Sequence, residues 1–439
     1  MLSKQIITAN NIEKYINTEN IENIARKEGF LKRNRKITPL IFFKACLLIS
    51  LNPINSLSSW AVAIGFLIGC TISKQALGKR FNGACVLFIM NLLFSVLKSS
   101  SNMNKYVEGG LFSSFNRAII QDSTTLKLPA RLAKILPGCG NQHTKKTASI
   151  KLQTSYDLLS ENFLDLNLTG ARRNDQAASP DILSIIQAGD LIVRDLGYFS
   201  IPVLRQIEMK YAFFLTRCPH KLNLYNTDGT KLDLLATLQK TGSLDIKVLA
   251  GEKERFPVRL VAIPVPEEVA NTRRRKLKEN RNSSVNPTRE HLALMNWEIF
   301  LTNVPSSVWS AKDVSSIYGI RWRIEIIFKA WKQYFNLTGF TNASEHQVKV
   351  LIYARLLFIT LFQVSIFGPW ALKVKHKTGQ NLSLLKIAKF VSQNFWLILH
   401  ALASPKGARL LEDQIIKHCT YDKRKRLNYQ CIIEMLSLS

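Results

Sequence analysis

The fold of this chain is indicated most clearly by residues 318–332, which read Tyr-Gly-Ile-Arg-Trp-Arg-Ile-Glu-Ile-Ile-Phe-Lys-Ala-Trp-Lys. At about 100° per residue, a helix gathers four polar side chains within an arc of about 60° and over about 21 Å: Tyr318, Arg321, Glu325 and Lys332. A second, apolar stripe consists of Ile320, Ile324, Ile327 and Trp331. The pattern predicts a helix with one buried face and one polar face. That polar face either contacts phosphates or is a solvated surface with Glu–Lys pairs.

Two aspartates follow apolar runs earlier in the chain. Asp122 comes after residues 118–120, and Asp195 closes the run at residues 191–193. Because the carboxyl ends of strands gather side chains into one crevice, we expect the two aspartates to lie close together. Taken alone, each is equally typical of a turn or a helix cap. With Glu325 they predict a carboxylate triad that binds hard divalent cations and supports two-metal phosphoryl transfer.

Other acids are alternative members of this triad, namely Asp157, Asp165 and Asp175. Asp175 is the strongest rival and lies in Arg-Arg-Asn-Asp-Gln at residues 172–176. We interpret it as a positioning or structural residue, because this polar stretch is typical of a loop. The histidines show no metal-binding spacing.

The charge of the chain points to a polyanionic partner. Its 439 residues include 60 Lys+Arg and 31 Asp+Glu, for a formal net charge of +29 at pH 7. That excess of cations predicts a nucleic acid as the partner. Hydrophobic residues make up 46% of the chain, which excludes a wholly disordered or fibrous protein.

Cysteine usage and the apolar segments predict an intracellular protein. The seven cysteines form no CxxC pair, and we interpret them as reduced core residues. Residues 1–7 lack the apolar segment of a signal peptide. Residues 60–72 are too short to span a bilayer and residues 350–372 contain Arg355, so we expect buried helices and no membrane span.

The apolar patterns divide the chain into five regions. Residues 1–105 predict a helical DNA-binding region, in which residues 60–69 and 73–81 form either a helix-turn-helix or a plain helical hairpin. Mixed strands and helices predict an α/β or α+β core over residues 106–210 and 306–345. Residues 211–305 predict a β-rich insertion between these two parts. Residues 346–439 predict a helical C-terminal region.

The spacing Y-x2-R-x3-E-x6-K, the Asp122-Ser-Thr turn and the Asp195-Leu-Gly-Tyr turn resemble the DDE transposases of bacterial insertion sequences, in particular the insertion-sequence-four family. The resemblance extends over about residues 115–345. It implies an RNase H-like catalytic core with Asp122, Asp195 and Glu325 as catalytic and metal-binding triad, and two Mg²⁺ or Mn²⁺ ions as cofactors. It also implies that Tyr318, Arg321 and Lys332 contact transposon-end DNA. A homodimer that synapses two ends and cuts in trans is implied as well, with residues 346–439 as its interface.

Two further features of the insertion predict DNA contacts. By the same resemblance, Trp297 stacks on a flipped base during hairpin formation, although a tryptophan packed in the core fits the sequence too. The run from Arg273 to Lys278 contains Arg273, Arg274, Arg275 and Lys276. Because the whole chain is basic, we prefer phosphate contact to a merely solvated helix for this run.

The predicted function is metal-dependent transposition: cleavage at terminal inverted repeats and strand transfer of the freed 3′-hydroxyl to target DNA. Two alternatives stay open, a structure-specific RNase H-like nuclease and a catalytically inactive DNA-binding derivative. The expected location is the bacterial cytoplasm, with association to the nucleoid when the protein is bound to DNA.

Overall fold

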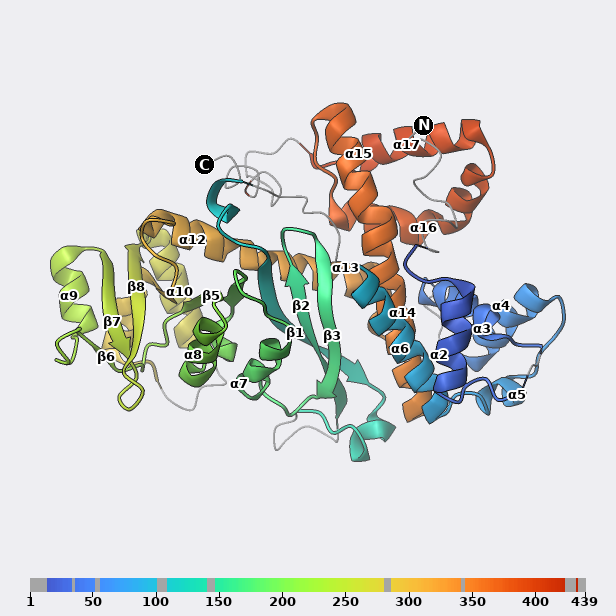
Figure 1. Cartoon of the computed structure of the whole chain (residues 1–439), viewed down its shortest axis with the longest axis horizontal. Coiled ribbons are helices and arrows are strands. Elements are labelled where there is room, and N and C mark those ends of the chain that lie inside the picture. Colours follow the sequence, from blue (N-terminus) through green and yellow to red (C-terminus); the bar gives the residue numbers. More distant parts are fainter. Residues whose placement is uncertain are drawn as a thin grey trace.

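A single mixed sheet runs through the middle of the protein (Figure 1). The structure is a computed structural model that describes residues 14–33, 36–51, 56–100, 109–139, 147–279, 286–340, 344–422 and 432. The insertion, in yellow and light green, lies at one end of this sheet. The N-terminal helices in blue and the C-terminal helices in orange and red lie at the other end.

The sheet has nine strands in the order β3-β2-β1-β4-β5-β9-β8-β7-β6. β1, β4 and β5 pair in parallel, and every other neighbouring pair is antiparallel. The five strands β3-β2-β1-β4-β5 form the RNase H-like core, so the predicted fold class is confirmed. The strands are β1 (Ala118–Leu128), β2 (Ala148–Asp157), β3 (Asn162–Gly170), β4 (Leu191–Arg194), β5 (Phe213–Arg217), β6 (Leu224–Tyr225), β7 (Leu244–Ala250), β8 (Phe256–Pro264) and β9 (Trp297–Thr302).

The insertion extends the core sheet and does not form a separate layer. β5 lies in the range that the sequence analysis gave to the insertion, yet it pairs in parallel with β4 and completes the core. β9 then pairs antiparallel with β5 and carries β8, β7 and β6 beyond it. Because β9 leads directly into α12, the helices that follow are tied to the same sheet.

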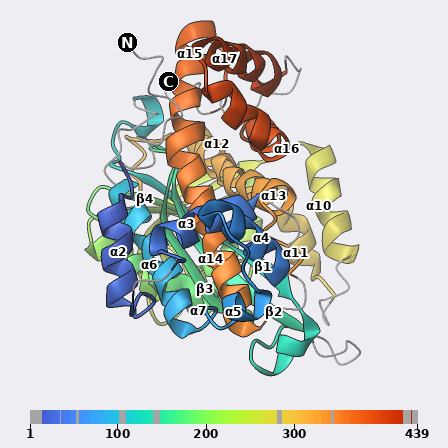
Figure 2. The ribbon, with the colours of Figure 1, turned by 90° about the vertical axis from the view of Figure 1, so that its right-hand side faces the viewer.

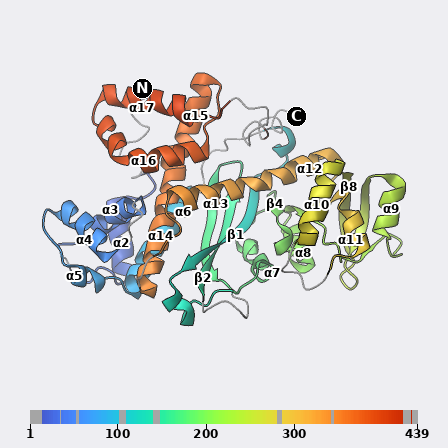
Figure 3. The ribbon, with the colours of Figure 1, turned by 180° about the vertical axis from the view of Figure 1, so that it is seen from behind.

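The helices of the core and insertion lie on both faces of the sheet. α12 packs against β5, β8 and β9, and α13 packs against β1 on the same side of the sheet (Figure 3). These helices are α7 (Asp175–Ala178), α8 (Ile201–Met209), α9 (Leu234–Thr241), α10 (Glu267–Glu279), α11 (Arg289–Leu294), α12 (Ala311–Gly319) and α13 (Arg323–Tyr334), with 3₁₀ turns at Gly110–Phe112, Ala130–Lys134, Ser179–Ser184, Leu196–Tyr198 and Ile320–Trp322.

The N-terminal region is helical, as predicted. Ser73 caps α5 by accepting a hydrogen bond from the Ala76 N–H at 3.1 Å. The helix expected over residues 73–81 ends at Gly78, because Phe81 turns inward and its ring packs edge-on against Trp60 at 5.3 Å. The helices are α2 (Thr18–Lys27), α3 (Pro39–Ser50), α4 (Leu57–Ile68), α5 (Lys74–Gly78) and α6 (Gly83–Ser100).

The C-terminal region is built on one long apolar helix, which runs beside α3 and α6 (Figure 2). A π-helical turn at Gln363–Phe367 joins its two halves, α14 (Glu345–Phe362) and α15 (Gly368–Thr378). Arg355 is fully buried in α14, with its guanidinium 4.9 Å from the ring of Phe340. The remaining helices are α16 (Leu384–Leu402) and α17 (Pro405–Cys419).

Two of the described helices are long and apolar enough to cross a membrane, Gly83–Ser100 and Glu345–Thr378. The second is almost entirely buried inside the protein, as predicted for residues 350–372. The expectation that residues 60–72 are buried is only partly correct. Phe66 on α4 is 86% exposed, because the opposite face of this helix, with Trp60 and Ile64, packs into the core.

The cysteines are less uniformly buried than the sequence suggested. Cys46, Cys85 and Cys419 are buried core residues, as expected. Cys70 and Cys139 are exposed, because both lie in loops after their helix or 3₁₀ turn has ended. The six cysteines of the described residues are free thiols, and Cys431 lies outside those residues.

Candidate active site

The two aspartates lie side by side on neighbouring parallel strands. β1 and β4 pair through Gln121 and Arg194, so that Asp122 and Asp195 are the next residues on each strand. The expectation that Asp122 ends a strand is wrong. β1 continues to Leu128 because it still pairs with β2 beyond the point where β4 stops. Only Asp195 leaves its strand, and it precedes the 3₁₀ turn Leu196–Tyr198.

Glu325 lies in the first turn of α13, which packs against β1, the strand that carries Asp122. The single helix expected over residues 318–332 is divided, because a 3₁₀ turn at Ile320–Trp322 separates α12 from α13. The apolar stripe is correct: its four members are buried, namely Ile320, Ile324, Ile327 and Trp331. The polar face is less exposed than expected, since Tyr318 and Arg321 are buried.

The guanidinium of Arg321 joins the three acids. Its Nη1 lies 2.9 Å from Asp122 Oδ2, its Nη2 lies 3.2 Å from Glu325 Oε1, and its Nε lies 3.8 Å from Asp195 Oδ1. The side chain of Arg321 is only 9% exposed, whereas those of Asp195 and Glu325 are 44% and 42% exposed. The triad predicted from the sequence therefore converges on one buried cation.

The environment of Asp122 favours its protonated form. Burial, together with the neighbouring Asp195 and Glu325 charges, outweighs the opposing effects of the Ser123 N–H and Arg321 and raises the pKa of this carboxyl to about 6. The Ser123 N–H donates to Asp122 Oδ1 at 2.7 Å, which leaves Oδ2 to Arg321. Because the three carboxylates repel one another, a cation bound among them would be stabilised.

Asp175, the rival of the sequence analysis, lies beside the triad. Its Oδ1 accepts hydrogen bonds from the Ser123 hydroxyl at 2.8 Å and from Lys151 Nζ at 3.1 Å. A Cβ placed on Gly197 would lie 3.5 Å from Asp175 Oδ2 and 3.8 Å from Asp195 Oδ2. The glycine thus leaves open space between two carboxylates.

These carboxylates suit a hard divalent cation by the chemistry of their oxygen donors. The open space at Gly197 faces two of the carboxylate oxygens and is consistent with such an ion. Within the described part of the chain, no three His, Cys, Asp or Glu side chains already surround a common point at metal-binding range. Arg321 accounts for this finding, since its guanidinium lies among the three acids.

Comparison with known proteins agrees with this geometry. Residues 113–361 match the family model described as Transposase DDE domain. The chain belongs to this family. The matched segment includes the RNase H-like strands, all three acids and the insertion, and DDE transposases generally depend on divalent metal ions.

Curated relatives cover most of the chain. It is 26% identical to the transposase for insertion sequence element IS231F of Bacillus thuringiensis subsp. israelensis, over 95% of this chain and 92% of the relative. It is 29% identical to the transposase for IS231D of B. thuringiensis subsp. finitimus, over 87% and 84%. The transposase for IS1151 of Clostridium perfringens is 25% identical over 81% and 80%. A solved piggyBac transposase synaptic complex with hairpin DNA aligns over 97% of this chain and 86% of its own, with 12% identity and a TM-score of 0.45.

Trp297 begins β9 and lines a cavity beside the triad of this DDE protein. Its indole Nε1 donates to the Gly242 carbonyl at 2.7 Å, and its ring is partly exposed. The cavity has a volume of about 210 Å³ and is also lined by Leu196, which follows Asp195 in the chain, and by Arg217. Trp297 and the residue that follows the second aspartate therefore line one hollow.

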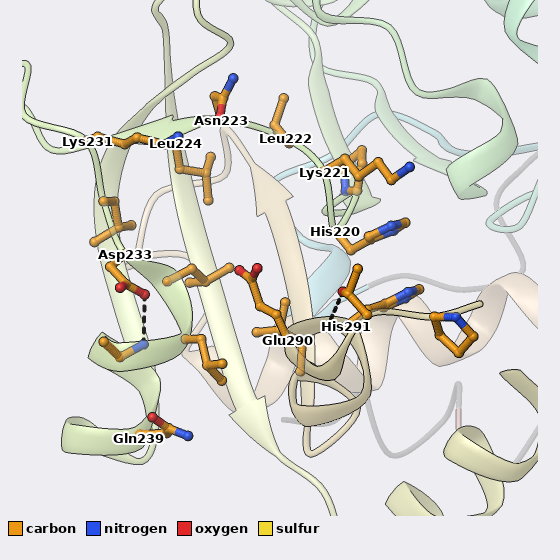
Figure 4. A pocket seen from close by; sticks show the side chains of 18 of the residues that line it. His220, Lys221, Leu222, Asn223, Leu224, Lys231, Asp233, Gln239, Glu290 and His291 are labelled. Carbon is orange, nitrogen blue, oxygen red and sulfur yellow. Dashed lines mark hydrogen bonds between the residues drawn. The ribbon is translucent and has the colours of Figure 1, made fainter. Parts of the chain in front are cut away.

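Two histidines also line this cavity. His220 and His291 stack face to face, with ring centroids 3.7 Å apart and an angle of 3° between the ring planes (Figure 4). Both also line a larger cavity of about 1110 Å³ in the insertion. Burial lowers the pKa of both imidazoles, which favours a neutral stack.

The cations of α10 divide into two pairs. Arg273 forms an ion pair with Glu298, and Arg274 donates hydrogen bonds to Asn296 and to the Leu292 carbonyl. Arg275 and Lys276 are exposed. Neither the phosphate contact nor the solvated helix considered from the sequence describes Arg273 and Arg274, because acceptors of the protein itself hold both side chains.

Tyr318 and Lys332 lie at the two ends of the signature. The Tyr318 ring packs against Phe300 at 5.0 Å and beneath the guanidinium of Arg217 at 5.4 Å. Burial raises the pKa of its phenol to about 12. Lys332 is partly buried in the last turn of α13, and burial lowers the pKa of its ammonium.

Sequence reasoning did not identify Arg217, His220 and His291 as residues of the site. A signal was present, since Arg-Cys-Pro-His at residues 217–220 overlaps the end of β5. The same rule that identified Asp195, polar residues where a strand ends, applies to this turn.

Proposed function

We propose that this chain is the transposase of an insertion sequence. It cuts DNA at the terminal inverted repeats of its element and joins the freed 3′-hydroxyl to target DNA. The observation that carries the proposal is the convergence of Asp122, Asp195 and Glu325 on one point of an RNase H-like sheet.

The three acids would hold Mg²⁺ or Mn²⁺, two ions in all. Ions bound there would activate the attacking hydroxyl and stabilise the leaving 3′-oxygen. The chain itself orients the acids: the Ser123 N–H directs Asp122, the parallel register aligns Asp195, and α13 carries Glu325 across the sheet. One such site serves both hydrolysis and strand transfer.

The DNA is bound, in this proposal, along the basic surface that borders the triad. Exposed Arg275 and Lys276 contact phosphates directly, and Lys332, Tyr318 and Arg321 act at the cleaved end. Arg273 and Arg274 contribute by orienting α10 through Glu298 and Asn296. The net charge of +29 supports a DNA-binding role.

Trp297 receives a flipped base next to the cut. The hollow that it shares with Leu196 supports this role, because Leu196 adjoins Asp195. A base that leaves the duplex loses stacking worth a few kcal/mol, and an exposed indole face replaces part of it. The same hollow offers Arg217 as a cation for the phosphate of an extruded nucleotide.

A homodimer holds two transposon ends and cuts in trans, with residues 346–439 as its interface. Exposed apolar side chains in this region support the assignment, notably Trp396 and Leu397 on α16. The protein works in the bacterial cytoplasm and associates with the nucleoid when it is bound to DNA.

A strand-transfer assay tests the function. Asp122→Asn, Asp195→Asn and Glu325→Gln should each abolish nicking and joining in Mg²⁺ but retain binding of end DNA, because an amide keeps the shape of the carboxyl and loses its charge. Glu268→Gln on exposed α10 is the matched control and should behave as wild type. Nicking by any of the three triad variants would remove that residue from the triad.

The same assay separates the two competing functions. A structure-specific nuclease would nick the end and would not join a pre-cut end to target DNA. An inactive DNA-binding derivative would bind the end and neither nick nor join it. The presence of all three acids argues against the inactive derivative.

A further inference from the structure

We infer that Arg321 is the built-in counter-ion of the triad, which holds the three acids together and excludes divalent cations until DNA draws its guanidinium away. This inference rests on the proposed function, because it takes the three acids to be the metal site. It assigns Arg321 a positioning role within the protein, in addition to any contact with DNA.

The first step is the division of contacts around the guanidinium. Each of three nitrogens faces a different acid: Nη1 faces Asp122, Nη2 faces Glu325 and Nε faces Asp195, at 2.9, 3.2 and 3.8 Å. Arg321 therefore links β1, the end of β4 and α13. A planar fork with five N–H donors suits such a triple contact, which the single ammonium of a lysine cannot reproduce.

The second step is charge. Three carboxylates around a half-buried point repel one another, and a cation among them offsets part of that repulsion. Arg321 supplies one positive charge, and its side chain is nine-tenths buried. Lys151, the other cation that contacts an acid of this region, is paired with Asp175. In the DNA-free protein, Arg321 thus keeps the carboxylates near the geometry that they need.

The third step is competition. A divalent cation binds carboxylate oxygens at about 2.0–2.6 Å. Asp122 Oδ2 and Glu325 Oε1 already accept hydrogen bonds from Arg321. The guanidinium and a metal ion that uses these oxygens cannot both occupy the centre of the triad. Metal binding in the absence of DNA therefore requires the displacement of Arg321.

The fourth step is the group that draws Arg321 away. The arginine belongs to the 3₁₀ turn between α12 and α13, and its neighbour Trp322 is 57% exposed, with the guanidinium 5.4 Å from its ring. The buried side chain of Arg321 thus lies beside a residue that is exposed to solvent. A DNA phosphate offers the two oxygens that a guanidinium binds best. Binding of DNA and binding of metal then favour each other, and by linkage the coupling is reciprocal.

The test measures Mn²⁺ binding by the full-length protein, from the free-ion signal in electron paramagnetic resonance, with and without a pre-cut transposon end. Without DNA, Arg321→Gln should bind Mn²⁺ more tightly than wild type, by roughly 5- to 150-fold, the usual range of such couplings. Adding the DNA should tighten binding by wild type and leave the variant nearly unchanged. Arg289→Gln, which removes an exposed cation of α11, is the matched control and should resemble wild type without DNA.

Equal or weaker Mn²⁺ binding by Arg321→Gln would overturn the inference. If that variant melts at a lower temperature, Arg321→Lys replaces it: the lysine keeps the charge but cannot contact three acids, and we expect intermediate tightening. Asp195→Asn in the Arg321→Gln background separates the two proposals. Loss of Mn²⁺ binding there supports the inference and the metal triad together, whereas retained binding would refute the metal triad itself.

Discussion

Single residues in this protein often act through their neighbours. Trp297 is an example, because one edge of its indole binds the Gly242 carbonyl while its ring lines the hollow beside Leu196. The indole is therefore held by the insertion and still accessible from the active site. Two substitutions of Trp297 distinguish stacking on DNA from packing within the protein.

Trp297→Ala should permit the first nick, since the three acids are unchanged, and should stall the attack that forms the hairpin. The reason is that the extruded base loses its stacking partner, worth roughly 1 to 3 kcal/mol. A gel time course that resolves nicked, hairpin and double-strand-break products on a labelled end measures this effect.

Trp297→Phe is the control for this experiment. It keeps an aromatic face and loses the hydrogen bond to Gly242, so it should retain most hairpin formation. If Trp297→Ala slows every step together and lowers the melting temperature, the residue is core packing. Normal products at a normal rate from Trp297→Ala would contradict both roles.

We expect the stability of the protein to depend on pH through Asp165 on β3. Burial, with a smaller contribution from the Asp181 charge, raises the pKa of this carboxyl to about 6. A raised pKa in the folded state means that the group stabilises the fold while protonated, below the unfolded pKa, and that this stabilisation is lost as pH rises through about 6. Above that pH the ionised Asp165 destabilises the fold.

Asp165→Asn should therefore stabilise the protein at pH 8. We expect its unfolding free energy to increase by an amount on the order of 1 to 3 kcal/mol and its melting temperature to rise. The gain should disappear as pH falls towards 4. Thermal melts of both proteins across this range test the prediction. A stabilisation that is constant with pH would show that the charge of Asp165 is not its cause.

At the level of elements, α10 illustrates how one helix divides its cations between the protein and the solvent. Arg275→Ala and Lys276→Ala should each flatten the salt dependence of DNA binding, by about 0.9 in the slope of log K against log salt for each phosphate that the variant no longer neutralises. Binding isotherms at several salt concentrations measure the slope.

Arg273→Ala on the same helix is the informative comparison. Its guanidinium is paired with Glu298, so this substitution should lower stability and leave the salt slope nearly as it is. If Arg275→Ala and Lys276→Ala leave the salt slope unchanged and Arg273→Ala flattens it, then Arg273 contacts the DNA and the exposed pair does not.

Across the whole molecule, Glu161 joins two contacts that connect α13, the sheet and the C-terminal region. Arg323 of α13 lies 2.8 Å from Glu161 in the turn between β2 and β3, and the Glu161 carbonyl accepts a hydrogen bond from Gln363 in the π-helical turn. The Arg323 side chain is fully buried. The helix that carries Glu325 is thus fixed both to the sheet and to the long C-terminal helix.

Glu161→Gln should destabilise the protein by about 3 to 5 kcal/mol, because it leaves the charge of Arg323 buried without its carboxylate. Lys349→Gln is the control: it breaks a more exposed i,i+4 pair with Glu345 and should change stability by less than about 0.5 kcal/mol. Urea unfolding measures both. Equal effects would mean that the buried pair contributes no more than the surface pair.

The local sequence determined which helix face is buried and predicted the three acids that the structure brings together. The apolar period of residues 318–332 is the stripe that is buried, a helix begins after Ser73 where the sequence placed one, and both aspartates follow apolar runs on neighbouring strands. These features depend on contacts between near residues, for which spacing alone determines which face is buried. The resemblance carried by the same residues predicted the fold and the family.

Only the tertiary structure decided which groups face one another. Arg321 and Asp122 are 199 residues apart, and their contact depends on the order of strands and on the path of α13 across them. The pairing of β5 with β4, the acceptors that meet Arg273 and Arg274, and the hollow between Leu196 and Trp297 have the same origin. Hydrophobic periodicity predicts which face of an element is buried, but not the element that buries it, because the hydrophobic effect is non-directional. An ion pair between distant residues depends in addition on where their two backbones meet.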